Sequence, residues 1–292
     1  MSTDFSERES GKTKKAQFHV PPDSVRAGQA HPLKRWSEHA WRLSAFPMIL
    51  FLLIPIAMLF TRITPQTLLA HLGQKDVLQA IGISLKSTLA SLALILLFGT
   101  PLAYLMGRHS FRSKKALDTL IDLPTVLPPS VAGLALLMTL GRRGIIGGWL
   151  DEMGIQVAFT IAAVVLAQTF VAAPFYIRAA ALGFASIDLE IVQAAQLDGA
   201  GRWQIFRYLF FPLSRIALLS GAMMSWARAL GEFGATILFA GNLPGRTQTM
   251  TTAIYLGFER DLESALTLSV ILVIISFLSL LLIKILVSYE SG

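Results

Sequence analysis

The sequence predicts an all-α membrane protein with six transmembrane helices. Hydrophobic residues make up 54% of the 292 residues and charged residues only 15%, whereas soluble domains have roughly 45–50% and 25%. The mean hydropathy of +0.60 agrees with a membrane location. A helix needs about 20 mostly apolar residues to cross the ~30 Å hydrocarbon layer. Six segments reach or approach that length: 45–61, 82–106, 122–140, 157–182, 213–240 and 264–287.

The chain divides into a polar arm, residues 1–43, and a transmembrane domain, residues 44–288. The arm carries both charge signs, contains Pro21-Pro22 and lacks apolar periodicity, so we expect it to be mostly disordered. The first apolar run begins near Ala45 and has no small-residue cleavage site behind it, unlike a secretory signal peptide. We therefore expect the first span to be retained.

The distribution of basic residues predicts the orientation in the membrane. Seventeen of the 25 Lys and Arg residues lie in the arm, in 107–121, in 178–215 and at the C-terminal end, and six lie in the opposite loops. Lys and Arg are enriched on the cytoplasmic side, so both termini are expected there, together with the loop 188–211. The net charge of +7 therefore reflects topology and does not indicate nucleic-acid binding.

The third segment carries three prolines in its first half, Pro124, Pro128 and Pro129. Proline removes a backbone donor and clashes with the preceding turn, and the freed backbone groups need a partner in hydrocarbon. One interpretation places this segment inside the bundle or beside an aqueous path, with regular helix from near Ser130. The other is a proline-rich start of a helix at the cytoplasmic surface.

Charged side chains inside the spans are the candidates for a translocation path or gate. Arg228 and Glu232 are four residues apart in the fifth segment, so one helix face would carry both and they could pair. They either line a polar conduit, where Arg228 attracts an anion, or form a structural ion pair. Gly231 and Gly234 provide either close helix packing or a bendable point. Lys86, near the outer end of the second segment, is expected to be an interfacial anchor.

Motifs for catalysis and metal binding are absent from the sequence. There is no cysteine, the five histidines are scattered, and no protease or hydrolase motif occurs. Gly11-Lys12-Thr13 resembles the end of a phosphate-binding loop, but Ser6 replaces its first glycine. We expect no enzyme and no bound metal or cofactor. Energy for transport would come from a partner or an ion gradient, and a membrane scaffold or receptor is a third possibility.

The polar stretch between the fourth and fifth segments is the most informative part of the chain. Small and apolar residues run up to Asp198, and Gly199 and Gly201 are expected to stop the helix. Aromatic residues then hold the chain against the membrane surface: Trp203, Phe206 and Phe210. This pattern predicts a compact knob that contacts another protein.

The same stretch resembles the cytoplasmic loop of ABC importer permeases. That pattern is E-A-A, three residues, Gly, nine residues, an aliphatic residue, one residue and Leu-Pro. Here Ala194, Ala195, Gly199, Leu209 and Pro212 match it, while Gln193 replaces Glu and Phe211 replaces Leu. The resemblance implies a type I importer fold in a prokaryotic inner membrane, with a coupling helix at 188–201.

The resemblance also implies partners. They are a second permease copy, two ATP-binding cassette subunits that use ATP and Mg, and an extracytoplasmic binding protein. Three further stretches are similar to the branch that transports molybdate, tungstate and sulfate: 123–130, 141–147 and 228–249. A tetrahedral oxyanion is therefore the implied substrate, molybdate first, with tungstate or sulfate as alternatives. A secondary anion transporter is the alternative from another class, and Glu232 is the only clear buried acid for it.

Overall fold

The computed structural model describes the backbone of residues 32–290 and the side chains of residues 43–282, 284 and 285. Within those residues the regular structure is helical, without strands. The chain separates into two units, residues 1–55 and 56–292, which are treated individually. Four described helices are long and apolar enough to cross a membrane, or six if each of two bent helix pairs is one span.

Helix α1, Pro32–Thr61, accounts for the described part of the first unit and continues into the second. Pro32 occupies its first position, where the fixed φ of proline favours helix and the missing N–H costs nothing. Residues 32–43 of the expected arm belong to this helix. The rest of the expected arm, with Gly11-Lys12-Thr13, lies outside the described residues.

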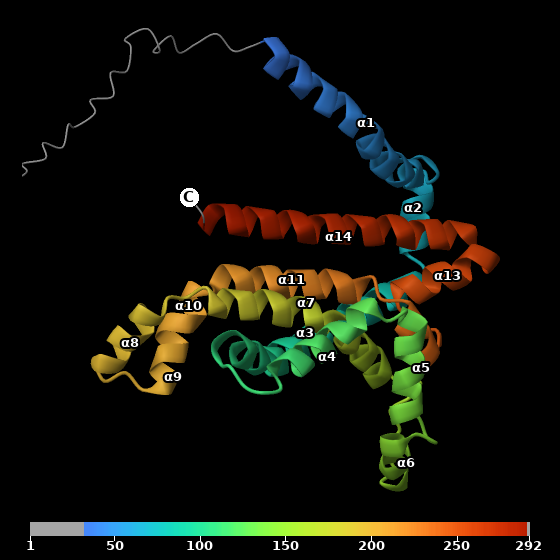
Figure 1. Ribbon diagram of the computed structural model, residues 1–292. Helices are drawn as coiled ribbons and strands as arrows, with labels where there is room; N and C mark the ends of the chain where they lie inside the picture. The colour runs from blue at the N-terminus through green and yellow to red at the C-terminus, as the bar shows by residue number, and fades with distance from the viewer. Residues whose placement is uncertain (1–31, 291–292) are drawn as a thin grey trace, which may run out of the picture. The chain divides into compact units, whose positions relative to one another are not determined.

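The second unit contains all the remaining helices (Figure 1). In chain order they are α2 Pro65–Leu72, α3 Lys75–Arg108, α4 Lys114–Val126, α5 Pro129–Leu140, α6 Ile145–Glu152, α7 Ile161–Ala185, α8 Leu189–Leu197, α9 Arg202–Ile205, a π-helical turn Phe206–Phe210, α10 Phe211–Leu213, α11 Arg215–Leu230, α12 Gly234–Phe239, α13 Met250–Arg260 and α14 Leu262–Glu290. Helices α3, α7 and α14 confirm the second, fourth and sixth predicted segments. Three of the other helices, α2, α6 and α13, were not predicted.

Helix α7 is central to this unit because α3 and α11 both pack along it. Small residues bring α7 and α11 close together. A Cβ atom added to Gly183 would lie 2.5 Å from Cβ of Ala217, and one added to Gly221 would lie 2.8 Å from Cβ of Ala179. The two contacts are four residues apart on each helix, which is the spacing of small residues that lets helices associate in lipid.

The third predicted segment is two helices and not one span of regular helix. Helices α4 and α5 meet at an angle of 113°. Leu127 and Pro128 between them are extended, with ψ of 136° and 134°. Each of these residues precedes a proline, and a following proline disfavours the helical conformation. Helix α5 begins at Pro129, which confirms the expectation of regular helix from near Ser130.

The fifth predicted segment, 213–240, is also interrupted. Helix α11 ends at Leu230, residues 231–233 are not helical, and the short helix α12 follows. Gly231 closes α11, and its weak helix preference explains why the helix ends within an apolar run. At the other end, the helical stretch Arg202–Leu213 meets α11 at 71°. The continuous helix expected over residues 213–240 is therefore wrong.

The start of α14 is fixed by polar contacts with α2. Asp261 caps α14 by accepting the backbone N–H of Ser264 at 3.2 Å. The hydrogen bonds from Ser264 hold the pKa of the Asp261 carboxyl below its usual value. His71 of α2 reaches the same turn, with its Nε2 3.0 Å from Oε2 of Glu263.

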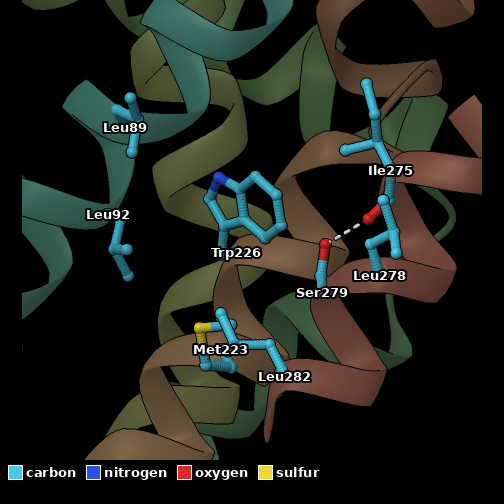
Figure 2. A pocket seen from close by; sticks show the side chains of 8 residues that line it. All are labelled: Leu89, Leu92, Met223, Trp226, Ile275, Leu278, Ser279 and Leu282. Carbon is cyan, nitrogen blue, oxygen red and sulfur yellow. Dashed lines mark hydrogen bonds between the residues drawn. The ribbon is translucent and has the colours of Figure 1, made fainter.

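An apolar hollow of about 380 Å³ lies between α3, α11 and α14 (Figure 2). Its few polar atoms are satisfied: Trp226 donates to the Thr88 hydroxyl at 3.2 Å, and the Ser279 hydroxyl donates to the carbonyl of Ile275 on its own helix. The remaining lining is aliphatic: Leu89, Leu92, Met223, Leu278 and Leu282. Such a lining suits hydrocarbon and offers an anion no hydrogen bond.

Candidate functional site

Residues 188–211 form a compact helical knob at one end of α7 and α11, while α5 and α6 lie towards the other end (Figure 1). Gly199 has a φ of +83°, which ends α8 in the left-handed conformation that glycine accepts without strain. The N–H of Ala200 donates to the carbonyl of Ala195 at 3.0 Å, and the N–H of Gly201 donates to Oε1 of Gln204 at 2.7 Å. The prediction that Gly199 stops the helix is confirmed, whereas Gly201 caps the start of the next helix, α9.

The knob rests on an aromatic cluster that joins it to α3 and α7. The ring of Tyr104 makes edge contacts with three phenylalanines, with centroid distances of 5.7 Å to Phe184, 5.5 Å to Phe206 and 5.2 Å to Phe210. Phe184 and Phe210 are fully buried. Such pairs stabilise by roughly 0.5–1.5 kcal/mol each beyond the area they bury. The cluster therefore fixes the knob to the ends of two long helices.

Arg108 at the end of α3 strengthens this attachment. Its Nη1 donates to the carbonyl of Ile187 at 2.8 Å and to that of Phe184 at 3.4 Å, so it satisfies carbonyls at the C-terminal end of α7. Its guanidinium also lies 4.8 Å from the ring centroid of Phe210. Sequence analysis missed both Tyr104 and Arg108, although an aromatic and a basic residue at a helix end next to an aromatic loop were a usable signal.

Most side chains of the knob's helix α8 are exposed. Val192 is buried, and Ala195 is half-buried. The other predicted contact residues are exposed: Gln193, Ala194, Asp198, Gly199 and Gly201. Leu189 and Leu197 are also exposed, at 64% and 88%. A surface that mixes apolar and polar side chains in this way is typical of a protein contact.

The second group of predicted residues surrounds the break between α11 and α12. Arg228 and Glu232 form an ion pair, with Nη1 2.8 Å from Oε2. Glu232 is 1% exposed and Arg228 31%. The pairing is as predicted, but the two residues do not share a helix face: Arg228 lies in the last turn of α11, and Glu232 follows the helix end. The pair therefore spans the break.

Glu232 holds the break in place through three further contacts. Its Oε1 accepts the backbone N–H of Ala235 at 2.8 Å, which satisfies a free donor at the start of α12. Its backbone carbonyl accepts the hydroxyl of Thr251 at 2.8 Å, and its N–H donates to the carbonyl of Ala229 at 3.1 Å. The ion pair and the backbone hydrogen bond offset the cost of removing this carboxylate from water.

The breaks in the third and fifth predicted segments touch each other. A Cβ atom added to Gly234 would lie 2.6 Å from Cβ of Pro129, and one added to Gly133 would lie 2.8 Å from the Cα of Ala235. Helices α5 and α12 therefore approach at their backbones. Gly234 acts in close packing here, while Gly231 is exposed and ends α11. Pro129 at the first break and Gly234 at the second, which are far apart in the sequence, therefore lie in one contact between α5 and α12.

A second charged cluster, unforeseen from the sequence, joins α4 to α7. Arg178 donates from Nε to Oδ1 of Asp122 at 2.6 Å and also forms an ion pair with Asp118. Its Nη2 donates to the backbone carbonyl of Asp118 at 3.0 Å. Asp118 and Asp122 are four residues apart on one face of α4. Arg178 is therefore part of a helix contact, whereas its sequence position suggested a loop charge.

Comparison with known proteins gives the family. The model of the binding-protein-dependent transport system inner membrane component matches residues 99–289. The chain belongs to this family. It is therefore a multi-pass inner membrane protein and the non-catalytic permease component of an ABC importer.

Curated relatives cover nearly the whole chain. The molybdenum transport system permease protein ModB of Mycobacterium tuberculosis is 38% identical over 86% of this chain and 95% of its own length. The sulfate transport system permease protein CysW of Escherichia coli is 34% identical over 87% of this chain and 88% of its own. A crystal structure of a bacterial ABC transporter that imports alginate matches with a TM-score of 0.65 over 90% of this chain, at 18% identity.

These findings agree with the fold and with the predicted class. The similarity to the alginate transporter supports the type I importer architecture, at an identity that bears on fold alone. Membership of this family contradicts the two alternative classes, a secondary transporter and a membrane scaffold or receptor. Within the described residues, no three His, Cys, Asp or Glu side chains come together as a metal site.

Proposed function

We propose that this chain is the permease subunit of an ATP-driven importer for a tetrahedral oxyanion, with molybdate as the first candidate. The observation that carries the proposal is the match to a molybdenum permease, at 38% identity over 86% of this chain and 95% of that protein. The sulfate permease matches over a similar length at 34% identity. Sulfate and tungstate are therefore the second candidates, because both are tetrahedral dianions.

The proposed assembly contains two copies of this chain, two ATPase subunits and an extracytoplasmic binding protein. The knob 188–211 is the proposed contact with the ATPase, through Gln193, Ala194, Ala195, Asp198, Gly199 and Gly201. The exposed face of α8 supports this role, and so does the attachment of its buried face to α3 and α7. Both termini and the knob face the cytoplasm in this proposal, as the basic residues predict.

The break between α11 and α12 is the proposed gate in the path. Arg228 is partly exposed and attracts an anion, while Glu232 keeps the break in a single geometry. Gly231 allows the chain to turn. Gly234 allows α12 to approach α5. Two buried polar atoms nearby support a hydrated path, because neither has a hydrogen-bond partner among the described residues: Oγ1 of Thr236 and Oε1 of Gln168.

The proposed cycle follows from these two regions. ATP closes the two ATPases, and the knobs move with them. The aromatic cluster transmits that motion to α3, α7 and α11, so the spans open towards the outside and accept the anion. ATP hydrolysis then reverses the motion, using Mg that the partner ATPase holds.

Uptake in proteoliposomes tests the function. The permease–ATPase complex is reconstituted with its binding protein, ATP is enclosed, and accumulation of radioactive molybdate is measured. We expect uptake that requires ATP and is suppressed by excess tungstate more than by excess sulfate. Uptake that follows an imposed proton or sodium gradient without the ATPase would overturn the proposal. Accumulation of sulfate in preference to molybdate would reassign the substrate.

Substitution of Arg228 tests the path. We expect Arg228→Gln to reduce uptake strongly while the complex still assembles, because the amide keeps a hydrogen bond to Glu232 but removes the positive charge. Arg260→Gln is the matched control, since Arg260 is exposed at the end of α13. Full uptake by Arg228→Gln would show that its charge is not needed.

A further inference from the structure

We propose that a groove along the first three turns of α3 is a receiving site for the oxyanion, used before the anion enters the path between the spans. The groove has a volume of about 510 Å³. Its lining comes from the start of α3, the turn before it and the loop before α13: Gly73, Lys75, Leu78, Gln79, Gly82, Ile83, Lys86 and Gly245. The identity of the anion rests on the proposed function; the groove itself does not.

The lining residues of α3 form one continuous face. They recur at intervals of three and four residues from Lys75 to Lys86, which places them on one side of a helix. Eleven residues at 1.5 Å each put the two lysines about 16 Å apart along the helix axis. The flexible four-carbon stems let both ammonium groups turn towards the middle of the groove, over Gly82.

The groove carries positive charges that no acidic lining residue neutralises. Lys75 and Lys86 are both exposed, and neither forms an ion pair with an acidic group in the described chain. The lining contains no Asp or Glu. Arg246, also exposed, follows Gly245 directly. A concave surface with one sign of charge raises the local concentration of ions of the opposite sign.

The length of α3 places the groove outside the hydrocarbon. Its 34 residues extend about 51 Å, whereas the hydrocarbon layer is about 30 Å thick. The longest stretch of α3 without a charged residue follows Lys86 and continues past Met106, close to the aromatic cluster of the knob. The turns from Lys75 to Lys86 therefore project on the side opposite the knob. In the proposed topology this is the side from which the substrate arrives.

Two glycines keep the groove open and shaped. A Cβ atom added to Gly82 would meet nothing within 4 Å, so the space above this residue is free. Gly245 has a φ of +71°, and a Cβ atom there would lie 2.9 Å from Oε1 of Gln79. The backbone of the loop thus lies against the Gln79 amide, which makes no hydrogen bond with another described residue. Its N–H groups remain available to an anion.

The loop that carries Gly245 is rigid. The carbonyl of Leu243 accepts three backbone N–H groups, from Arg246 and Thr247 at 3.0 Å and from Gln248 at 3.1 Å. The Thr247 hydroxyl accepts the N–H of Leu243 at 3.1 Å. Two ammonium groups and an amide on a preorganised surface suit a tetrahedral dianion. They lack the enclosed geometry that would distinguish one such dianion from another. We therefore propose that the groove receives the anion but does not select among dianions.

Direct binding tests the site. Radioactive molybdate is titrated onto the nucleotide-free permease–ATPase complex in nanodiscs, without the binding protein. We expect the double variant Lys75→Gln, Lys86→Gln to bind at least roughly tenfold more weakly than wild type, because hydrogen bonds to two charged groups are lost. Gly82→Leu should weaken binding to a similar degree by filling the groove, and its side chain meets no steric obstacle at its base. Lys284→Gln, which removes one charge near the other end of the molecule, should bind as wild type does.

The outcomes separate this inference from the proposed function. If wild type takes up molybdate but the lysine and Gly82 variants bind it with unchanged affinity, the groove is not a receiving site and the function stands. If the lysine variant loses only affinity for the binding protein, the charges serve docking and the inference is wrong. If the complex binds sulfate in the groove and transports it in preference to molybdate, the site stands and the choice of molybdate fails.

Discussion

The knob and the α11–α12 break are both short interruptions of apolar sequence, and they treat polar groups in opposite ways. The knob buries Phe210 and leaves Gln193, Ala194 and Asp198 exposed. The break buries Glu232 and satisfies each of its carboxylate oxygens. Exposed side chains can exchange contacts with water for contacts with a partner, while buried charged groups fix one backbone geometry. We therefore propose that the first region contacts a partner and that the second fixes the backbone geometry.

Removal of the buried carboxylate should have the largest effect. Glu232→Ala leaves Arg228 and the N–H of Ala235 without a partner, and loss of one member of a buried pair typically costs about 3–5 kcal/mol. We expect a cost of about 3 kcal/mol, near the lower limit, because Arg228 is partly exposed. Thermal unfolding of the purified permease measures it. Glu232→Gln keeps an acceptor for the N–H of Ala235 and should therefore lose less stability. If Glu232→Ala were as stable as wild type, the buried carboxylate would not fix the break, and the distinction between the two regions would fail.

Loss of the aromatic centre beneath the knob should have the next largest effect. Tyr104→Ala removes the ring contacts with three phenylalanines and with His109, and we expect a loss of about 2 kcal/mol because the side chain is half-buried. The knob should then move without displacing α3 and α7. The number of anions transported per ATP hydrolysed should fall, with the ATPase still bound. Tyr104→Phe keeps the ring and is the control; unchanged coupling in Tyr104→Ala would show that the cluster does not transmit motion.

A charge on the exposed face of the knob should weaken assembly without weakening the fold. Ala194→Asp is expected to lower affinity for the ATPase roughly tenfold, because a carboxylate would be desolvated at the contact without a designed partner. Copurification and titration of the ATPase measure this. Ala116→Asp, on the exposed face of α4, is the matched control. Copurification at wild-type yield would place the ATPase contact elsewhere.

The smallest effect should come from Gln193. The side chain is exposed, and surface substitutions usually change stability by less than about 0.5 kcal/mol. Gln193→Glu should leave thermal unfolding unchanged and alter ATPase affinity by no more than roughly threefold. The affinity should also become more dependent on salt, because a rim charge is added. A large loss of stability would mean that Gln193 belongs to the knob's internal structure.

The sequence was sufficient for features that depend on composition and local chemistry. The runs around α3, α7 and α14 exceed the length of a span, and the prolines before α5 could not continue a helix. The glycines that end α8 were visible as well. The end of α11 at Gly231 was not, because a glycine in an apolar run is equally compatible with close packing. The pairing of Arg178 with Asp118 and Asp122 depends on chain segments 56 and 60 residues apart, which no local pattern reports.

The close contact of α7 with α11 determines how far a tilt of the knob would displace the other end of α11. Gly183 against Ala217 and Gly221 against Ala179 hold the two helices in close contact, so we expect them to turn together. Arg228 lies 13 residues beyond the start of α11, or about 20 Å along its axis. A tilt of about 5° at the knob would therefore displace Arg228 by about 2 Å. A displacement of that size is enough to break or form a hydrogen bond, so a small rotation at the knob is sufficient to alter the hydrogen bond between Glu232 and Thr251 of α13.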